Sequence, residues 1–377
     1  MISTIFWCSA LLIAYTLVGY PVLVNLLARL RTRDPRTGES ARDTLPSVGV
    51  VIAAYNEAQA LARKLDSLLA QDYPVHKLSL WVVSDGSTDE TASILARYAG
   101  QVRALHRRER FGKPSALNLA ASQIDAEILV FTDARQPLNR GAVSALVGCL
   151  LAPEVGVAGG TLVQRTSAAG ESENVGMYWR YEAWIRKAEA VVHSTAGASG
   201  ALYAIRASDF APIPEDTLLD DFEIPIRVLR KGKRIVLCEN AQAVDEVRHG
   251  VSRERERKIR TLAGNYQSFV RNLWLFDPRQ NPIWIQFLSH KVFRLLLPYF
   301  FVATLVSAWL LQGAFYDTVL AIMLVFVLIA LLGLTSKRLR EHRALGFCYA
   351  FAALNLASVV GLVRYLGGSA DVRWKRS

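Results

Sequence analysis

Acidic residues occur at three places in the middle of the chain that we assign to strand ends. Asp85 ends the stretch LSLWVVSD, Asp133 ends AEILVFTD, and the group Asp220, Asp221 and Glu223 opens a later helical stretch. Open α/β sheets bind ligands at the carboxyl ends of their strands, so these acids are expected to share one edge. A single aspartate is also common at helix caps and strand ends. As a set, the acids predict a nucleotide-binding crevice.

Arg135 stands two residues after Asp133, where enzymes that hold a phosphate-bound cation usually carry a second carboxylate. The fixed positive charge has two interpretations. It pairs with Asp133, or it faces a diphosphate and lessens the need for a metal ion. No G-x-G-x-x-G follows the first strand, and the chain has no G-x-x-x-x-G-K-[ST]. These absences argue against a dinucleotide oxidoreductase and a P-loop ATPase.

The elements that must position these residues alternate in type from residue 45 to about 240. Apolar runs typical of strands are separated by stretches of helical pattern. The expected strands cover 47–55, 78–85, 102–107, 126–133, 154–163 and part of 197–210. Ser87 and Glu90 have capping-box spacing at the start of one helix. The alternation predicts an α/β domain with a mostly parallel sheet.

Apolar segments near both ends of the chain are long enough to span a bilayer. Lys and Arg gather in 29–36 and 337–343, and the positive-inside rule puts both, with the middle domain, in the cytoplasm. We therefore expect a multi-pass protein of the cell (inner) membrane with four spans. The basic tail would then lie outside, unless the last stretch does not cross fully. The expected division is a first span in 1–30, a soluble domain in 45–267, an interfacial segment in 268–290, three spans in 291–366 and a basic tail in 367–377.

A formal net charge of +11 comes partly from these membrane-flanking residues and partly from basic clusters in 106–113 and 248–260. Such clusters fit solvated faces and anionic lipids, or a phosphate-bearing ligand. No nucleic-acid-binding motif accompanies the charge, so nucleic acid is not an expected partner. The four cysteines are widely scattered, which predicts neither a disulfide framework nor a metal cluster.

Six motifs give the middle of the chain a resemblance to family 2 glycosyltransferases. In order they are VIAAYNEA, VVSDGSTDET, GKPSALNLA, LVFTDA, GASGALYAIR and LLDDFEIPIRVLRKGKR, within about residues 50–270. The chain most resembles membrane-integrated polysaccharide synthases of the poly-N-acetylglucosamine, chitin-oligosaccharide, hyaluronan and cellulose types. This resemblance implies a GT-A fold and inverting transfer from a nucleotide-diphosphate sugar, expected to be UDP-linked, to a growing exopolysaccharide or glycan.

The resemblance also implies roles for single residues. Six positions match donor-binding residues of the family, namely Ala53, Tyr55 and Glu57 at the nucleobase, Asp85 at uracil or ribose, Lys113 at the diphosphate, and Asp133 at the diphosphate and metal. Asp133 matches the first acid of the D-x-D motif, which implies a divalent metal, Mg²⁺ or Mn²⁺, as cofactor. Gly200 and Ala201 would shape the acceptor site. Asp221 matches the last residue of the T-E-D motif, the general base.

Three motifs depart from the family pattern. D-x-D has Arg135 as its third residue, T-E-D reads Leu219-Asp220-Asp221, and Q-x-x-R-W reads Arg257-x-x-Arg260-Thr261. Arg135, Arg257 and Arg260 are then candidate diphosphate contacts, although the last two also fit a basic face at the membrane. The missing Trp, which normally lies under the acceptor sugar, weakens the case for a processive polymer. The alternatives are transfer of one sugar to a lipid carrier and an inactive homologue that serves as a scaffold. Other expected partners are membrane lipids and polysaccharide-export subunits.

Overall fold

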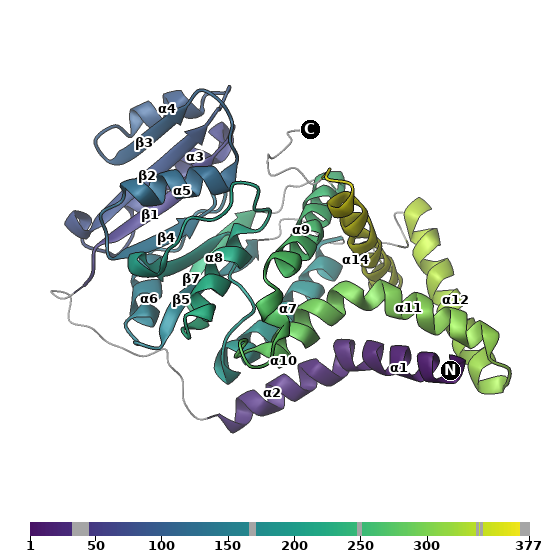
Figure 1. Ribbon diagram of the computed structural model, residues 1–377. Coiled ribbons are helices and arrows are strands. Elements are labelled where there is room, and N and C mark those ends of the chain that lie inside the picture. Colours follow the sequence, from purple (N-terminus) through teal and green to yellow (C-terminus); the bar gives the residue numbers. More distant parts are fainter. Residues whose placement is uncertain (32–44, 166–170, 247–250, 337–338, 340–341, 370–377) are drawn as a thin grey trace.

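The computed structural model describes the chain except for residues 32–44, 166–170, 247–250, 337–338, 340–341 and 370–377 (Figure 1). Most of the basic tail lies outside the described residues. Parts of the basic segments 29–36, 248–260 and 337–343 lie outside them as well.

A seven-stranded sheet forms the centre of the large domain. Its order is β3 (Val102–Arg107), β2 (Leu78–Asp85), β1 (Val48–Ala54), β4 (Ile128–Thr132), β6 (Leu202–Arg206), β5 (Val155–Arg165) and β7 (Arg234–Glu246). Among the described strands, β6 alone runs antiparallel to its neighbours, so the expected mostly parallel α/β sheet is confirmed. The strand β7 was not predicted from the sequence. Its pairing with β5 shifts register between Leu237 and Gln242, where the polar stretch ENAQ interrupts the apolar pattern.

Burial with a period of two divides the core into two layers. Val48, Val50 and Ile52 of β1 pack in the layer that contains α3 (Ala58–Leu69), α4 (Thr91–Arg97) and α6 (Ala142–Leu150). Val51 and Ala53 pack in the opposite layer with α5 (Lys113–Gln123) and α8 (Asp220–Arg230). Successive side chains of a strand point to opposite faces, so both faces of the sheet are covered. The loops at the carboxyl ends of β1, β2 and β4 are left to carry polar residues.

Helix α4 begins at Thr91, and the capping box expected from Ser87 and Glu90 was wrong. The Ser87 hydroxyl instead accepts a hydrogen bond from the Asn56 backbone N–H at 3.1 Å. The N-cap position is Glu90, and Asp89 Oδ1 accepts a hydrogen bond from the N–H of Thr91, the first residue of the helix, at 3.0 Å. The loop after β2 is thereby fastened to the loop after β1.

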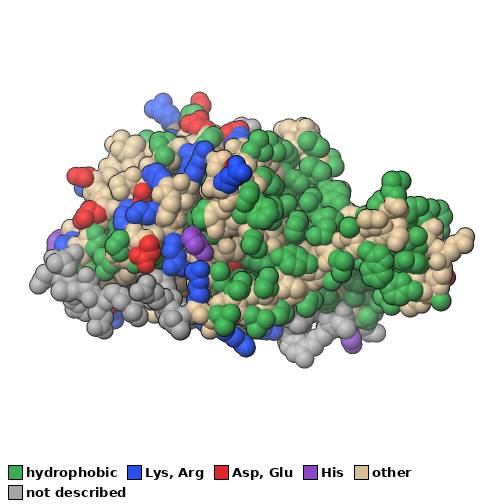
Figure 2. Space-filling model, turned by 60° about the horizontal axis from the view of Figure 1, so that its bottom comes forward, with side chains coloured by type: hydrophobic (Ala, Val, Ile, Leu, Met, Phe, Trp, Pro, Cys, Tyr) green, Lys and Arg blue, Asp and Glu red, His purple; other side chains and the backbone are tan. Residues whose placement is uncertain are grey.

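Four helical segments are long and apolar enough to cross a membrane, namely Ile2–Leu30, Trp284–Leu310, Ala314–Thr335 and Leu345–Leu366. They comprise α1 (Ile2–Ala14) with α2 (Tyr20–Leu30), α10 (Trp284–Gln286) with α11 (Phe293–Leu310), α12 (Ala314–Thr335) and α14 (Arg343–Leu366). They gather at one end of the molecule (Figure 1), and hydrophobic side chains cover that end in Figure 2. Four spans were expected, and the second candidate helix, Trp284–Leu310, includes part of the segment expected at the interface.

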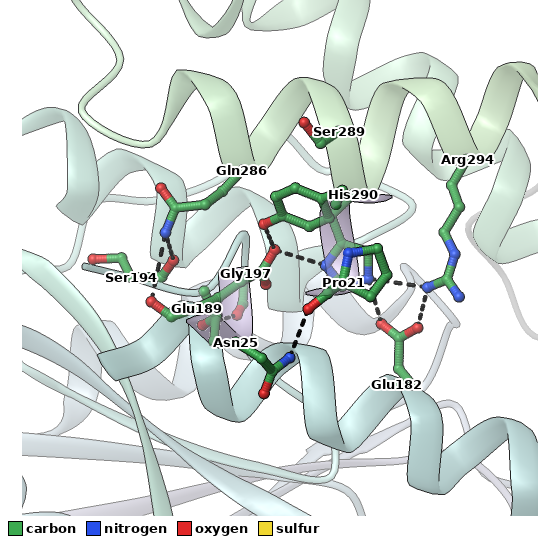
Figure 3. Close-up of polar contacts among 12 residues, drawn as sticks. Pro21, Asn25, Glu182, Glu189, Ser194, Gly197, Gln286, Ser289, His290 and Arg294 are labelled. Atoms are coloured by element: carbon green, nitrogen blue, oxygen red, sulfur yellow. Dashed lines mark hydrogen bonds and ion pairs between the residues drawn. The ribbon is translucent and has the colours of Figure 1, made fainter. Parts of the chain in front are cut away.

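A buried polar cluster fastens the large domain to these helices (Figure 3). The two helices that join the sheet to the spans are α7 (Glu171–Val192) and α9 (Val251–Arg271). On α7, Glu189 accepts a hydrogen bond from Tyr20 Oη at 2.6 Å and contacts His290 Nδ1 at 2.9 Å. Glu182 pairs with Arg294 and with His290 Nε2, the latter at 3.0 Å. Because buried polar groups need partners, the cluster fixes how the domain sits on the membrane helices.

Candidate active site

Lys113 lies among the acidic residues at the carboxyl edge of the sheet. Its Nζ is 2.9 Å from Asp133 Oδ1, just past β4, and 3.1 Å from Asp220 Oδ2, at the start of α8. Burial lowers the pKa of Lys113, but the charges of the neighbouring aspartates, Asp221 included, outweigh burial and raise it above its ordinary value. The lysine is therefore charged, and it joins acids that are far apart in the sequence.

The loop before α5 is shaped around Asp85. Gly112 has a φ of 99°, a left-handed conformation that glycine adopts without strain. Its N–H donates to Asp85 Oδ2 at 2.7 Å, and the Phe111 N–H donates to Asp85 Oδ1 at 3.2 Å. Arg107 also pairs with Asp85, at 3.4 Å. Asp85 thus holds the turn at Phe111 and Gly112, which places Lys113 next to the acidic residues.

A pocket beside Lys113 is formed by the ends of β1 and β2 and the loop before α5. Its lining residues are Ala53, Ala54, Tyr55, Asp85, Arg110, Gly112 and Lys113. The structure thus brings together Ala53, Tyr55, Asp85 and Lys113, whose roles at the donor remain predictions. Arg110 was missed by sequence reasoning, although it belongs to the basic cluster in 106–113. Its guanidinium lies 3.7 Å from the centre of the Tyr55 ring, a cation–π contact that closes one side of the pocket.

Asp221 is the second residue of α8 and is held by the loop before β6. The Gly200 N–H donates to Asp221 Oδ2 at 3.0 Å, and the Ala198 N–H donates to the Asp221 carbonyl at 2.9 Å. A Cβ at position 200 would lie 3.0 Å from that same Oδ2, so glycine permits the close approach. Burial, followed by the charge of Asp220, raises the pKa of Asp221 to about 6, against the opposing charge of Lys113. Such a carboxylate is suited to accept a proton near neutral pH.

Arg135 pairs with Glu57. Its Nε lies 2.9 and 3.0 Å from the two carboxylate oxygens of Glu57, whose side chain is 5% exposed. Lys113 pairs with one oxygen of Asp133, and both interpretations of Arg135 remain predictions. Glu57 is absent from the lining of the pocket that contains Tyr55. The role of Glu57 at the nucleobase remains a prediction.

Helix α9 carries Arg257 and Arg260. Burial lowers the pKa of Arg260, and the charges of Asp220, Asp133 and Asp221 oppose that shift. Arg260 is therefore within electrostatic range of the acidic cluster. Arg257 is exposed one helical turn earlier. A diphosphate role for either arginine remains a prediction.

The acids fit a divalent ion that is held partly by a donor. Within the described residues no group of three or more His, Cys, Asp or Glu side chains is arranged as a metal site. Mg²⁺ in phosphate-transfer sites is commonly held by one or two carboxylates together with phosphate oxygens. Asp133 is 28% exposed and has the chemistry for such a role. The residues present therefore suit an ion that arrives with a diphosphate.

Two family models match the chain. Residues 49–208 match the model described as glycosyl transferase family 2. Residues 133–335, more than half of the chain, match glycosyl transferase family group 2. The chain belongs to glycosyltransferase family 2. The matched ranges include Asp85, Asp133 and Asp221, so the acidic cluster lies in a glycosyltransferase domain.

One solved structure shares the fold of this chain, and two relatives are similar to it in sequence. A mannosyltransferase from Pyrobaculum calidifontis in complex with GDP-Man and Mn²⁺ shares the fold, with a TM-score of 0.72 and 23% identity over 97% of this chain and 99% of that one. The expected GT-A fold is thus confirmed. A β-monoglucosyldiacylglycerol synthase from Synechocystis sp. is 25% identical over 279 residues, 70% of this chain and 57% of the relative. One from Nostoc sp. is 31% identical over 134 residues, 34% and 28% of the two chains. The chain covers less than two thirds of either relative.

Proposed function

We propose that this family 2 glycosyltransferase transfers one sugar, with inversion, from a nucleotide-diphosphate donor to a lipid at the membrane surface. The observation that carries the reaction is the cluster of Lys113 with Asp133, Asp220 and Asp221. In this cluster Lys113 and Asp133 would interact with a diphosphate and its metal ion, and Asp221 is a separate carboxylate with a raised pKa. We expect a UDP-linked donor in the pocket beside Tyr55. The positive-inside pattern favours the cytoplasmic side of the cell membrane for this domain.

The donor side of the cluster would stabilise the leaving group. The nucleoside diphosphate gains negative charge as its bond to the sugar breaks, and the charged Lys113 would neutralise part of that charge. Asp133 would hold a divalent ion together with diphosphate oxygens, and the ion would add to this neutralisation. Arg260 of α9 interacts electrostatically with the same acids.

The acceptor side would activate a hydroxyl group. As the acceptor oxygen bonds to the anomeric carbon, its proton passes to Asp221 and the sugar–phosphate bond breaks. The Gly200 N–H, 3.0 Å from Oδ2, holds the carboxylate in one orientation. Attack from the face opposite to the leaving diphosphate inverts the anomeric configuration. No second carboxylate nucleophile is required, in contrast to a retaining glycosidase.

The raised pKa of Asp221 predicts a pH dependence. Only the ionised carboxylate accepts a proton, so the rate should fall as the pH drops through about 6, the folded-state pKa of Asp221. Below that value kcat/KM should fall about tenfold per pH unit, and above it the rate should level off. The measurement is kcat/KM from pH 5 to 8 with the donor concentration varied. A rate that stays constant down to pH 5 would remove Asp221 as the proton acceptor.

A lipid acceptor is favoured by the aromatic side chains that connect the proposed base, Asp221, to the second membrane span. Phe222, which follows Asp221, packs on Phe269 of α9 with ring centres 6.1 Å apart. Phe269 packs in turn on Phe287, in the second membrane span, at 5.0 Å. Thr261 replaces the Trp that would support a growing sugar chain. The two β-monoglucosyldiacylglycerol synthases named above support the same choice.

The test is the product formed by the purified full chain. The protein is incubated with a panel of UDP- and GDP-sugars, with vesicles that contain diacylglycerol or polyprenyl phosphate, or with oligosaccharides, and products are measured by mass spectrometry. We expect a lipid heavier by one sugar. A ladder of oligosaccharides would favour polymer synthesis and overturn the lipid proposal. Absence of sugar transfer with every donor would favour the scaffold alternative.

A further inference from the structure

Lys64 of α3 is buried completely beneath the proposed donor site. Its exposed fraction is 0%. Its Nζ donates to Thr132 Oγ1 at 2.7 Å and to the Gln136 carbonyl at 2.6 Å. Within the described part of the chain it has no carboxylate within 4.0 Å. Lys64 is thus a buried amine whose partners are a hydroxyl group and a peptide carbonyl.

An apolar residue would be the usual occupant of this position. Lys64 lies on the face of α3 that also buries Leu61, Leu65 and Leu68. Taking an ammonium group out of water costs several kcal/mol, whereas an apolar side chain of similar length carries no such cost. Lys64 therefore stabilises the domain less than an apolar side chain would. This cost indicates that its two hydrogen bonds serve a purpose other than stability.

Those hydrogen bonds lie on either side of Asp133. Thr132 is the last residue of β4 and precedes Asp133, and Gln136 follows Arg135. One nitrogen atom therefore fixes both ends of the segment 133–135. The Thr132 hydroxyl is itself a donor, to the Ala201 carbonyl at 2.6 Å. The brace thus extends from α3 through the end of β4 to the loop next to Asp221.

We propose that Lys64 is a positioning residue that holds Asp133 in register with the donor diphosphate and with the acceptor loop. This inference rests on the proposed function of Asp133. Burial lowers the pKa of Lys64 to about 7, and the charge of Asp133 opposes that shift. A neutral amine still has two N–H groups, so both hydrogen bonds persist in either protonation state.

Lys64→Met tests the proposal, because methionine fills a similar volume without the two hydrogen bonds. We expect the donor KM, and the donor Kd from titration calorimetry, to rise about 10- to 100-fold, the range found for residues that orient a ligating group. The value of kcat at saturating donor should fall much less, because Asp221 is untouched. The matched control is Lys77→Met. Lys77 lies just before β2, at the amino ends of the strands, and the substitution removes its hydrogen bond to the Leu45 carbonyl (2.6 Å). That control should leave the donor KM unchanged.

Thr132→Val provides a second route if Lys64→Met does not fold. It removes the hydroxyl that links Lys64 to Ala201, and it should raise the donor KM as well, whereas Thr132→Ser should restore it. In the double variant the two effects should be less than additive. A donor KM within twofold of native for both Lys64→Met and Thr132→Val overturns the inference. If Asp133→Asn also leaves donor binding unchanged, the proposed function of that site fails too, so the two failures are distinguishable.

Discussion

Replacing Asp221 with asparagine is expected to reduce sugar transfer about 10²- to 10⁴-fold, the usual contribution of a general base. Asparagine has nearly the same size, and its amide oxygen can still accept the hydrogen bond from the Gly200 N–H, now 3.0 Å from Oδ2. The loop before β6 should therefore keep its place. The amide cannot take a proton from the acceptor hydroxyl, so the chemical step alone is impaired. Donor Kd by titration calorimetry should stay near the native value while kcat at saturating donor falls.

The control for this variant is Asp216→Asn, five residues earlier on the loop that leads to α8. The Asp216 side chain is 65% exposed and pairs with Arg271, so its neutralisation changes a surface ion pair only. It should leave kcat and donor Kd unchanged. Turnover retained by Asp221→Asn, with a folded protein and an unchanged donor Kd, would show that another group accepts the proton.

Local patterns predicted most of the fold, because the hydrophobic pattern over a few residues indicates a strand or a helix. The expected strand 78–85, LSLWVVSD, corresponds to β2 residue for residue. The strand β7 was missed because its apolar alternation is broken in the middle, where its register against β5 also shifts. The capping box was wrong because Ser87 is drawn to the Asn56 N–H, a partner from another loop. In both cases a contact distant in sequence overrode the local signal.

In the candidate site, too, the sequence indicated the residues but not their contacts. The ends of the apolar strands indicated Asp85 and Asp133, and the resemblance to the family indicated Asp221. The pairing of charges could not be predicted, since it depends on which side chains meet in three dimensions. Lys113 reaches Asp133, and Arg135 turns to Glu57. Arg135 therefore links the loop after β4 to Glu57 after β1, and its contact with a diphosphate remains a prediction.

Asp133→Asn is accordingly expected to weaken donor binding about 10- to 100-fold, the equivalent of losing one charge-assisted contact. Asparagine keeps an oxygen near Lys113 Nζ, now 2.9 Å from Oδ1, but removes the negative charge that would hold a divalent ion. Lys113 retains its pair with Asp220, so the turn into α5 should persist. Donor Kd should be measured for both proteins with Mn²⁺ and with EDTA.

The response to EDTA distinguishes a metal-binding role from a purely electrostatic one. If Asp133 holds the ion, EDTA should weaken donor binding to the native protein and have little further effect on Asp133→Asn, because the two changes remove the same interaction. Equal effects of EDTA on both proteins would place the ion elsewhere, and unchanged donor binding in the variant would exclude Asp133 from the site. Asp125→Asn is the matched control, since Asp125 is exposed before the other end of β4. It should respond to EDTA as the native protein does.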